Sequence, residues 1–92
     1  MTTIFEWDKD ESASNFAKHG IDFVTAQKIW TDPFLLEIPA RTTDEPRWLA
    51  IGKLSGRFWS AVFTRRNEVV RLISVRRSRV EEVDIYENTI ES

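Results

Sequence analysis

Residues 47–77, RWLAIGKLSGRFWSAVFTRRNEVVRLISVRR, hold three runs of strand-forming residues with two short turns between them. The runs are Arg47–Leu54, Arg57–Thr64 and Val69–Arg77. They are rich in β-branched and aromatic side chains, which fit a pleated and half-buried surface. Ser55-Gly56 and Arg66-Asn67-Glu68 separate the runs, and connections this short join neighbouring antiparallel strands. The stretch therefore predicts an antiparallel β-meander.

A short strand and a helix are predicted before the meander. Ile4–Trp7 alternates as a strand does, and Asp8 can cap a helix together with Glu11 three residues later. Lys18-His19-Gly20 ends this helix with basic residues followed by a glycine suited to the left-handed position. The apolar face of the helix is expected to consist of Ala13, Phe16 and Ala17.

A second helix should form a hairpin with the first. Asp22 can cap it, and Asp32-Pro33 stops it. Its expected apolar face comprises Phe23, Ala26, Ile29 and Trp30. Phe34–Ile38 follows as a short strand, and the polar, turn-rich Pro39–Pro46 is the longest predicted loop.

A third helix is predicted after the meander. Ser78 and Glu81 have the spacing of a second capping box. Apolar residues then recur at a mixed helical spacing, at Val80, Val83, Ile85, Tyr86 and Ile90. The element order is β-α-α-β-β-β-β-α, which predicts an α+β fold, and 92 residues suffice for one domain spanning residues 1–92.

The charge is distributed unevenly along the chain. The formal net charge is −2, but residues 1–40 carry −4, residues 41–79 carry +7 and residues 80–92 carry −5. The positive charge therefore lies on the predicted strands, between two acidic ends. The chain has no cysteine, no basic and apolar leader, and no stretch of membrane-spanning length, so we expect a cytoplasmic protein that makes no contact with membranes.

Metal-free cleavage of RNA requires three things of a protein. It must deprotonate the attacking 2′-hydroxyl, neutralise the charge that builds on the phosphorus, and protonate the leaving oxygen. Arginine suits only the second task, because its guanidinium stays protonated. His19, the only histidine, and Lys18 stand at a helix end that favours cations. They are candidates for proton transfer, or they merely satisfy the last carbonyls of the helix.

The last strand offers candidate phosphate-binding arginines. Strict alternation places Arg71, Ile73, Val75 and Arg77 on one face and Leu72, Ser74 and Arg76 on the other. Arg76 would then project from an open face into a phosphate-binding groove. Alternatively, the arginines solubilise the sheet or pair with the acidic C-terminal helix. Trp48 and Trp59 could stack on bases, but we expect them in the core. We find no pattern of metal ligands and expect no cofactor.

Several short motifs resemble, in order and spacing, those of the BrnT toxin family. They are Phe5-Glu6-Trp7-Asp8, Asn15 followed by Lys18-His19-Gly20, Asp32-Pro33, Glu45-Pro46-Arg47, Ile51-Gly52, Thr64-Arg65-Arg66 and Arg71-Leu72-Ile73-Ser74-Val75-Arg76-Arg77. Each motif alone is weak, but together with Glu82 and Tyr86 they cover nearly the whole chain.

The resemblance implies a RelE-like fold and metal-independent RNA cleavage that inhibits translation. It also implies neutralisation by a ribbon-helix-helix antitoxin, BrnA, whose complex with the toxin binds operator DNA. Carried over by position, the resemblance raises the expectation that Lys18, His19, Arg66 and Arg76 are catalytic. The expected RNA-binding residues are Arg47, Arg65, Arg71 and Arg77.

The C-terminal helix departs from the family pattern, because Val80, Glu81, Val83, Asp84 and Ile85 stand where basic residues are typical. An acidic helix repels RNA, which leaves a second hypothesis open: an antitoxin-binding corepressor with little nuclease activity. A third hypothesis is a stand-alone domain that binds nucleic acid without chemistry.

Overall fold

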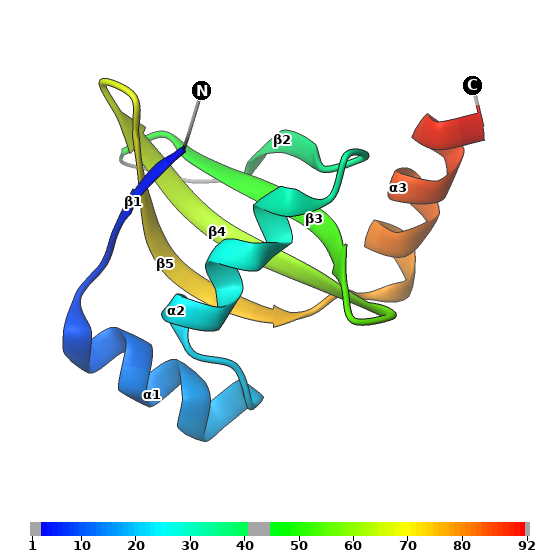
Figure 1. The fold of residues 1–92 in the computed structure, drawn as a ribbon. Helices are drawn as coiled ribbons and strands as arrows, with labels where there is room; N and C mark the ends of the chain where they lie inside the picture. The colour runs from blue at the N-terminus through cyan, green and yellow to red at the C-terminus, as the bar shows by residue number, and fades with distance from the viewer. Residues whose placement is uncertain (1–2, 41–44, 92) are drawn as a thin grey trace.

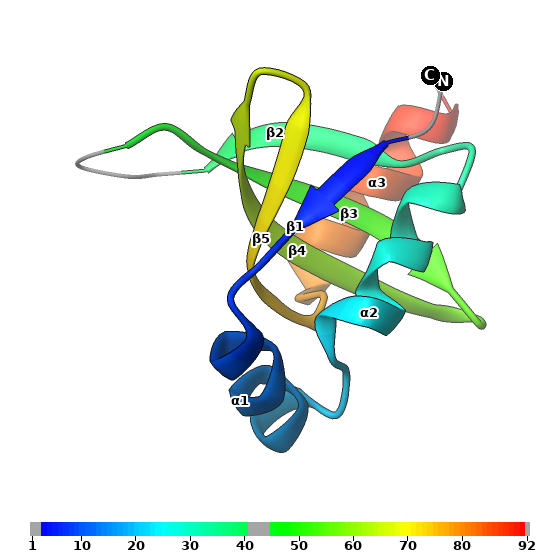
Figure 2. The same ribbon diagram turned by 60° about the vertical axis from the view of Figure 1, so that its left-hand side comes forward.

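The computed structural model describes residues 3–40 and 45–91, which form a mixed α+β fold. A five-stranded sheet in the order β1-β5-β4-β3-β2 has helices on both faces (Figures 1 and 2). The elements are β1 (Ile4–Glu6), α1 (Lys9–His19), α2 (Phe23–Ala26), the 3-10 helix η1 (Gln27–Thr31), β2 (Leu36–Ala40), β3 (Arg47–Leu54), β4 (Arg57–Arg66), β5 (Val69–Arg77) and α3 (Val80–Glu91). This order confirms the predicted sequence of elements.

The predicted meander is confirmed, since β2 to β5 pair as antiparallel neighbours. Ser55 and Gly56 both have positive φ, 53° and 77°, as expected for a tight turn that follows the twist of its strands. At the next hairpin the residue with positive φ is Asn67. The N-terminal strand β1 joins the sheet beside β5 and runs parallel to it.

Strict alternation along β5 is wrong, because the strand contains a bulge. Val62 of β4 faces Ser74, whereas Phe63 faces Leu72, so Ile73 has no partner. The alternation of side chains between the two faces of the sheet therefore shifts by one residue at the bulge. Leu72 and Val75 consequently lie on the same face, and both are fully buried.

The two faces of the sheet are covered by different helices (Figure 2). We call the face covered by α1, α2 and η1 the hairpin face, and the opposite one the α3 face. Arg76 lies opposite Ser60 on the α3 face, and Arg77 lies opposite Trp59 on the hairpin face. The bulge also places Arg71 on the α3 face, so the predicted grouping of Arg71 with Val75 and Arg77 is wrong.

Helix α1 is attached to the sheet by polar side chains, which corrects its expected apolar face. Ala13, Phe16 and Ala17 are exposed, and the buried residues of the helix are Ser12 and Asn15. The Asn15 amide nitrogen donates to the carbonyls of Ile21 and Val75 at 2.8 and 2.9 Å, and its oxygen accepts from Val75 N at 3.0 Å. The single buried amide thus joins α1, the following loop and β5.

The helical hairpin begins and ends largely as predicted. Asp8 caps α1, Gly20 follows it with φ 75°, and Asp22 caps α2. Phe23, Ala26 and Ile29 are fully buried, which confirms the expected apolar face. After Ala26 the chain tightens into η1 before Asp32-Pro33. Contact with β3 depends on Gly52, because a Cβ there would lie 2.7 Å from Ile29 Cγ2.

Strand β2 is displaced from its predicted position. It begins at Leu36 instead of Phe34 and continues through Pro39 to Ala40. Pro39 is tolerated because β2 is an edge strand that pairs only with β3. Residues 41–44 of the predicted loop lie outside the described residues.

The capping box of α3 is also displaced, by one residue. The helix begins at Val80, and Glu82 Oε1 accepts a hydrogen bond from the backbone N of Arg79 at 2.8 Å. The predicted pair of Ser78 and Glu81 is therefore wrong. The Ser78 hydroxyl lies 2.7 Å from Ser60 Oγ, across the sheet end.

We expect Asn15→Ala to lower the free energy of unfolding by about 2–3 kcal/mol, because it leaves the N–H and C=O of buried Val75 without their partner. Urea unfolding followed by circular dichroism measures the change. Ser14→Ala, on the exposed side of the same helix, is the matched control and should change stability by less than about 0.5 kcal/mol. Equal stability of the two variants would contradict the anchoring role of Asn15.

Candidate functional site

Four arginines of the meander are paired with carboxylates from other elements. Arg65 and Arg76 make bidentate contacts, which are the strongest geometry for a guanidinium and a carboxylate. The pairs are Arg65 with Glu37, Arg66 with Glu45, Arg71 with Glu6 and Arg76 with Glu82. The acidic ends of the chain thus fold back onto much of the basic middle.

The pair of Arg76 and Glu82 is the most enclosed of the four. Both guanidinium-to-carboxylate hydrogen bonds measure 2.8 Å, and the Glu82 side chain is 12% exposed. The hydrogen bonds from Arg76, helped by those from Arg79 N and Ser60 Oγ, outweigh burial and lower the pKa of Glu82 to about 2. Glu82 also raises the pKa of Arg76. Glu82 is therefore ionised at neutral pH, is a very weak proton acceptor, and balances the charge of Arg76.

Tyr86 is likewise unsuited to proton transfer. Its hydroxyl donates to Asp32 Oδ2 at 2.7 Å, its ring packs edge-on against Phe58, and only 4% of the residue is exposed. Burial, reinforced by the charge and hydrogen bond of Asp32, raises the pKa of Tyr86 to about 12. These contacts give the tyrosine a structural role in holding α3 against the η1–β2 connection.

The structure does not gather the four expected catalytic residues at one point. Lys18 and His19 are exposed at the end of α1, whereas Arg76 lies on the α3 face. Arg66 lies opposite Val69, at the other end of the β4–β5 ladder from Arg76. Seven residues of strand separate Val69 from Arg76, a distance of roughly 20 Å at about 3.3 Å per residue. One phosphate could not contact both arginines in this arrangement.

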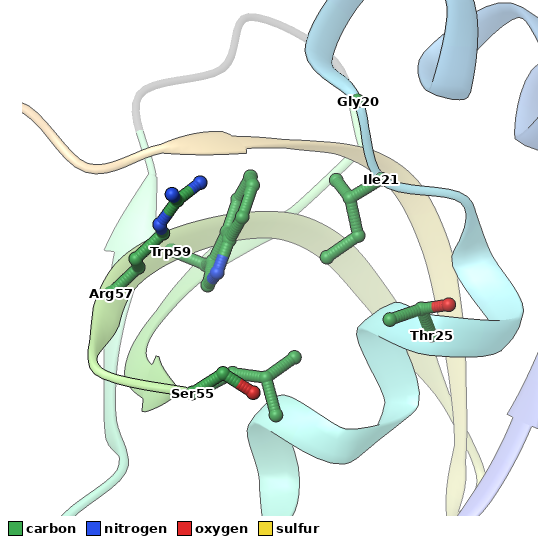
Figure 3. A pocket seen from close by; sticks show the side chains of 7 residues that line it. Gly20, Ile21, Thr25, Ser55, Arg57 and Trp59 are labelled. Atoms are coloured by element: carbon green, nitrogen blue, oxygen red, sulfur yellow. The ribbon is translucent and has the colours of Figure 1, made fainter.

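The end of α1 instead adjoins a pocket on the hairpin face. The pocket has a volume of about 350 Å³ and is lined by Gly20, Ile21, Thr25, Leu54, Ser55, Arg57 and Trp59. Figure 3 shows the indole of Trp59 between the Arg57 side chain and Ile21. The guanidinium of Arg77 also lies against this indole, 5.6 Å from its ring centroid.

Four cationic or titratable residues belong to the pocket or adjoin its lining, and we call them the α1-end cluster: Lys18, His19, Arg57 and Arg77. Arg57 lines the pocket, Arg77 lies against Trp59, and Lys18 and His19 directly precede Gly20 in the chain. Among residues 3–40 and 45–91, none of the four forms an ion pair with a carboxylate. Arg57 was missed in the sequence. The tight turn at Ser55-Gly56 is the sequence feature that places Arg57 at the start of β4, opposite Leu54. Nothing in the sequence near this turn indicates that α1 ends beside it.

The remaining predicted residues have simpler environments. Arg47 is exposed at the start of β3, on the edge shared with β2. The expectation that the tryptophans belong to the core is confirmed for Trp59, which is 8% exposed, and Trp48 packs against the same core. Within the described part of the chain, no group of histidine and carboxylate side chains has the arrangement of a metal site. No described helix is long and apolar enough to span a membrane.

Comparison with known proteins identifies one family. The family described as "Ribonuclease toxin, BrnT, of type II toxin-antitoxin system" matches residues 7–82. This range includes α1, every strand of the sheet except β1, and the first three residues of α3. None of the curated proteins searched matches the chain.

We expect Glu82→Gln to lower the free energy of unfolding at pH 7 by about 1–3 kcal/mol, since Arg76 loses its charged partner. The pKa of Glu82 is depressed from its ordinary value of 4.5 to about 2. Its stabilising effect is therefore complete above about pH 5 and disappears as the pH falls toward 2. Urea unfolding of both proteins at several pH values should show the difference shrinking over this range. A difference independent of pH would contradict the ion pair.

Proposed function

Because the chain belongs to the BrnT family of ribonuclease toxins of type II toxin-antitoxin systems, we propose that it cleaves RNA without a metal ion and thereby inhibits translation. The 2′-hydroxyl attacks the adjacent phosphorus, and the 5′-oxygen of the next nucleotide leaves. The observation that carries this proposal is the α1-end cluster: Arg57 lines a pocket with an aromatic wall and Arg77 lies against that wall, and among the described residues neither forms an ion pair with a carboxylate.

Within the cluster, His19 is the proposed proton-transfer residue. Glu82 and Tyr86 are each committed to another partner, with pKa values of about 2 and about 12. His19 is exposed at the end of α1 and directly precedes Gly20, which lines the pocket, and we propose that it reaches a phosphodiester bound there. Lys18 adds charge next to it, and the guanidinium of Arg77 neutralises the negative charge that develops on the phosphorus.

The other arginines are proposed to act on the RNA strand in different ways. Arg76 precedes Arg77 on β5 but faces α3, and it contributes to phosphate binding once an RNA phosphate competes with Glu82 for its N–H groups. Arg66, at the distant hairpin, binds the RNA strand away from the scissile bond. Arg47, Arg65 and Arg71 provide further contacts, weakened where carboxylates already hold them.

The wider biology follows the family. We propose a RelE-like architecture in a single cytoplasmic domain, which the mixed sheet with helices on both faces supports. The proposed partner is a ribbon-helix-helix antitoxin resembling BrnA, and operator DNA is bound only through the toxin-antitoxin complex. The paired acidic and basic side chains on the surface would let an antitoxin compete with RNA by charge.

Cleavage of RNA by purified protein in EDTA at low salt tests the proposal. Replacing the proton-transfer group in His19→Gln should reduce kcat/KM by about 10²–10⁴-fold and remove one limb of the pH–rate profile. Because His19 is exposed at the end of α1, we expect the His19→Gln variant to fold like the wild type. Circular dichroism checks that it does.

Lys18→Gln and Lys9→Gln form a matched pair of charge changes at opposite ends of α1. Only the change at Lys18 should slow cleavage. Wild-type protein that leaves RNA intact, or a His19→Gln variant as active as the wild type, would overturn the catalytic assignment.

A second candidate function is an antitoxin-binding corepressor with little nuclease activity. It is favoured by one observation, the bidentate hold of Glu82 on Arg76. Under this alternative, expression without the antitoxin leaves growth unimpaired, and RNA cleavage is measurable only in Glu82→Gln, where the guanidinium of Arg76 is freed. Growth arrest by the wild-type protein together with slower cleavage by Glu82→Gln would exclude it.

A further inference from the structure

We propose that the pocket between the end of α1 and the β3–β4 turn is a binding subsite for one unpaired ribonucleotide of the RNA, with its base against Trp59 and its phosphate on Arg57 and Arg77. This inference rests on the proposed function and assigns the part of the substrate that lies beside the site of cleavage.

The size and lining of the pocket fit a nucleotide. Its volume of about 350 Å³ is at the lower end of the range for small-molecule sites. Ile21, Leu54 and the indole of Trp59 provide apolar walls, while Thr25 and Ser55 provide hydroxyl groups. An apolar slot with a few polar groups at its rim suits a planar base whose edges can form hydrogen bonds.

The positive charge at the pocket is not neutralised by a neighbouring carboxylate, in contrast to that of four other arginines of the sheet. Arg65, Arg66, Arg71 and Arg76 each have a carboxylate partner. Arg57 lines the pocket and Arg77 lies against Trp59, and among the described residues neither forms an ion pair. A phosphate arriving here therefore need not displace an acidic side chain. The nearby carboxylate of Asp22 accepts a hydrogen bond from Thr25 N, as the cap of α2.

The walls of the pocket are held in place before any ligand arrives. Trp59 is 8% exposed and lies opposite Gly52 in the β3–β4 ladder. Gly20 and Ser55 stand in tight turns with φ of 75° and 53°. Both turns are short connections between packed elements, so ligand binding requires little reordering of the chain.

A guanidinium and an indole side by side are typical of sites for single-stranded nucleic acid, where bases stack and phosphates pair. An acidic peptide segment would use the arginines but would leave the apolar slot empty. The combination of slot and cation therefore favours a nucleotide over a carboxylate side chain.

The test is titration of the 15N-labelled full chain with 5′-nucleoside monophosphates, followed by NMR. The indole N–H signal of Trp59, assigned by its loss in Trp59→Phe, should shift and saturate. The nucleoside without phosphate and inorganic phosphate should each bind at least about tenfold more weakly, since each supplies one half of the recognition.

Arg57→Gln should weaken nucleotide binding about tenfold or more, and Arg57→Lys should fall between it and the wild type. Arg79→Gln is the matched control, an exposed arginine at the start of α3 on the opposite face, and its affinity should equal that of the wild type. Equal shifts with inorganic phosphate and nucleotide, or an acidic hexapeptide that shifts Trp59 where nucleotides do not, would overturn the proposal.

Binding of mononucleotides needs no cleavage, so the subsite and the nuclease activity are tested separately. If the protein binds nucleotides saturably but leaves RNA intact, the result supports the subsite and overturns the catalytic assignment. If RNA is cleaved and Arg57→Gln does not change the KM, the subsite proposal is overturned and the proposed nuclease activity stands.

Discussion

The buried amide of Asn15 fixes the position of α1, and the arrangement of the site depends on it. Both of its polar atoms bond to the backbone of Val75, just past the bulge in β5, and its nitrogen also holds the loop at Ile21. A helix held by an amide is fixed in rotation as well as in distance, because the hydrogen bonds have direction. Lys18, His19 and Gly20 follow within two turns, and Gly20 lines the pocket beside Trp59.

The second organising feature is the unequal neutralisation of the arginines. Carboxylates of β1, β2 and α3 hold Arg71, Arg65 and Arg76, so the acidic ends of the chain act on the basic middle through specific contacts. Within the described chain, Arg57 and Arg77 beside the pocket form no ion pair with a carboxylate. A small negative net charge is therefore compatible with an anion-binding region, since binding responds to local charge more than to the total.

Much of the fold could be predicted because its signals are local. The caps at Asp8 and Asp22 and the turn at Ser55-Gly56 each depend on a few adjacent residues. The predictions that were wrong depended on contacts between distant segments. The apolar residues of α1 predicted a buried apolar face. Instead, Asn15 forms hydrogen bonds with Val75, sixty residues away, so the helix side that carries Asn15 is buried and Phe16 is exposed.

The candidate site was harder to predict for the same reason. Lys18, His19 and Arg77 could be named from the sequence, but their grouping could not, because it requires knowing where α1 ends relative to β4. For Arg57, the turn at Ser55-Gly56 indicates its place at the start of β4 but not that α1 ends beside it. Arg66 and Arg76 were grouped because both match motifs of the BrnT family, but the register of β4 and β5 places them at opposite ends of that ladder.

The bulge at Ile73 has a consequence for how the chain tolerates changes in length. Beyond it, Arg76 and Arg77 lie on opposite sides of the sheet, one beside α3 and the other against Trp59. Deleting the extra residue at the bulge would make the ladder regular and leave Arg76 opposite Ser60 and Arg77 opposite Trp59, each on its present side. The strand can therefore lose a residue at this position without moving any arginine to the other surface of the sheet.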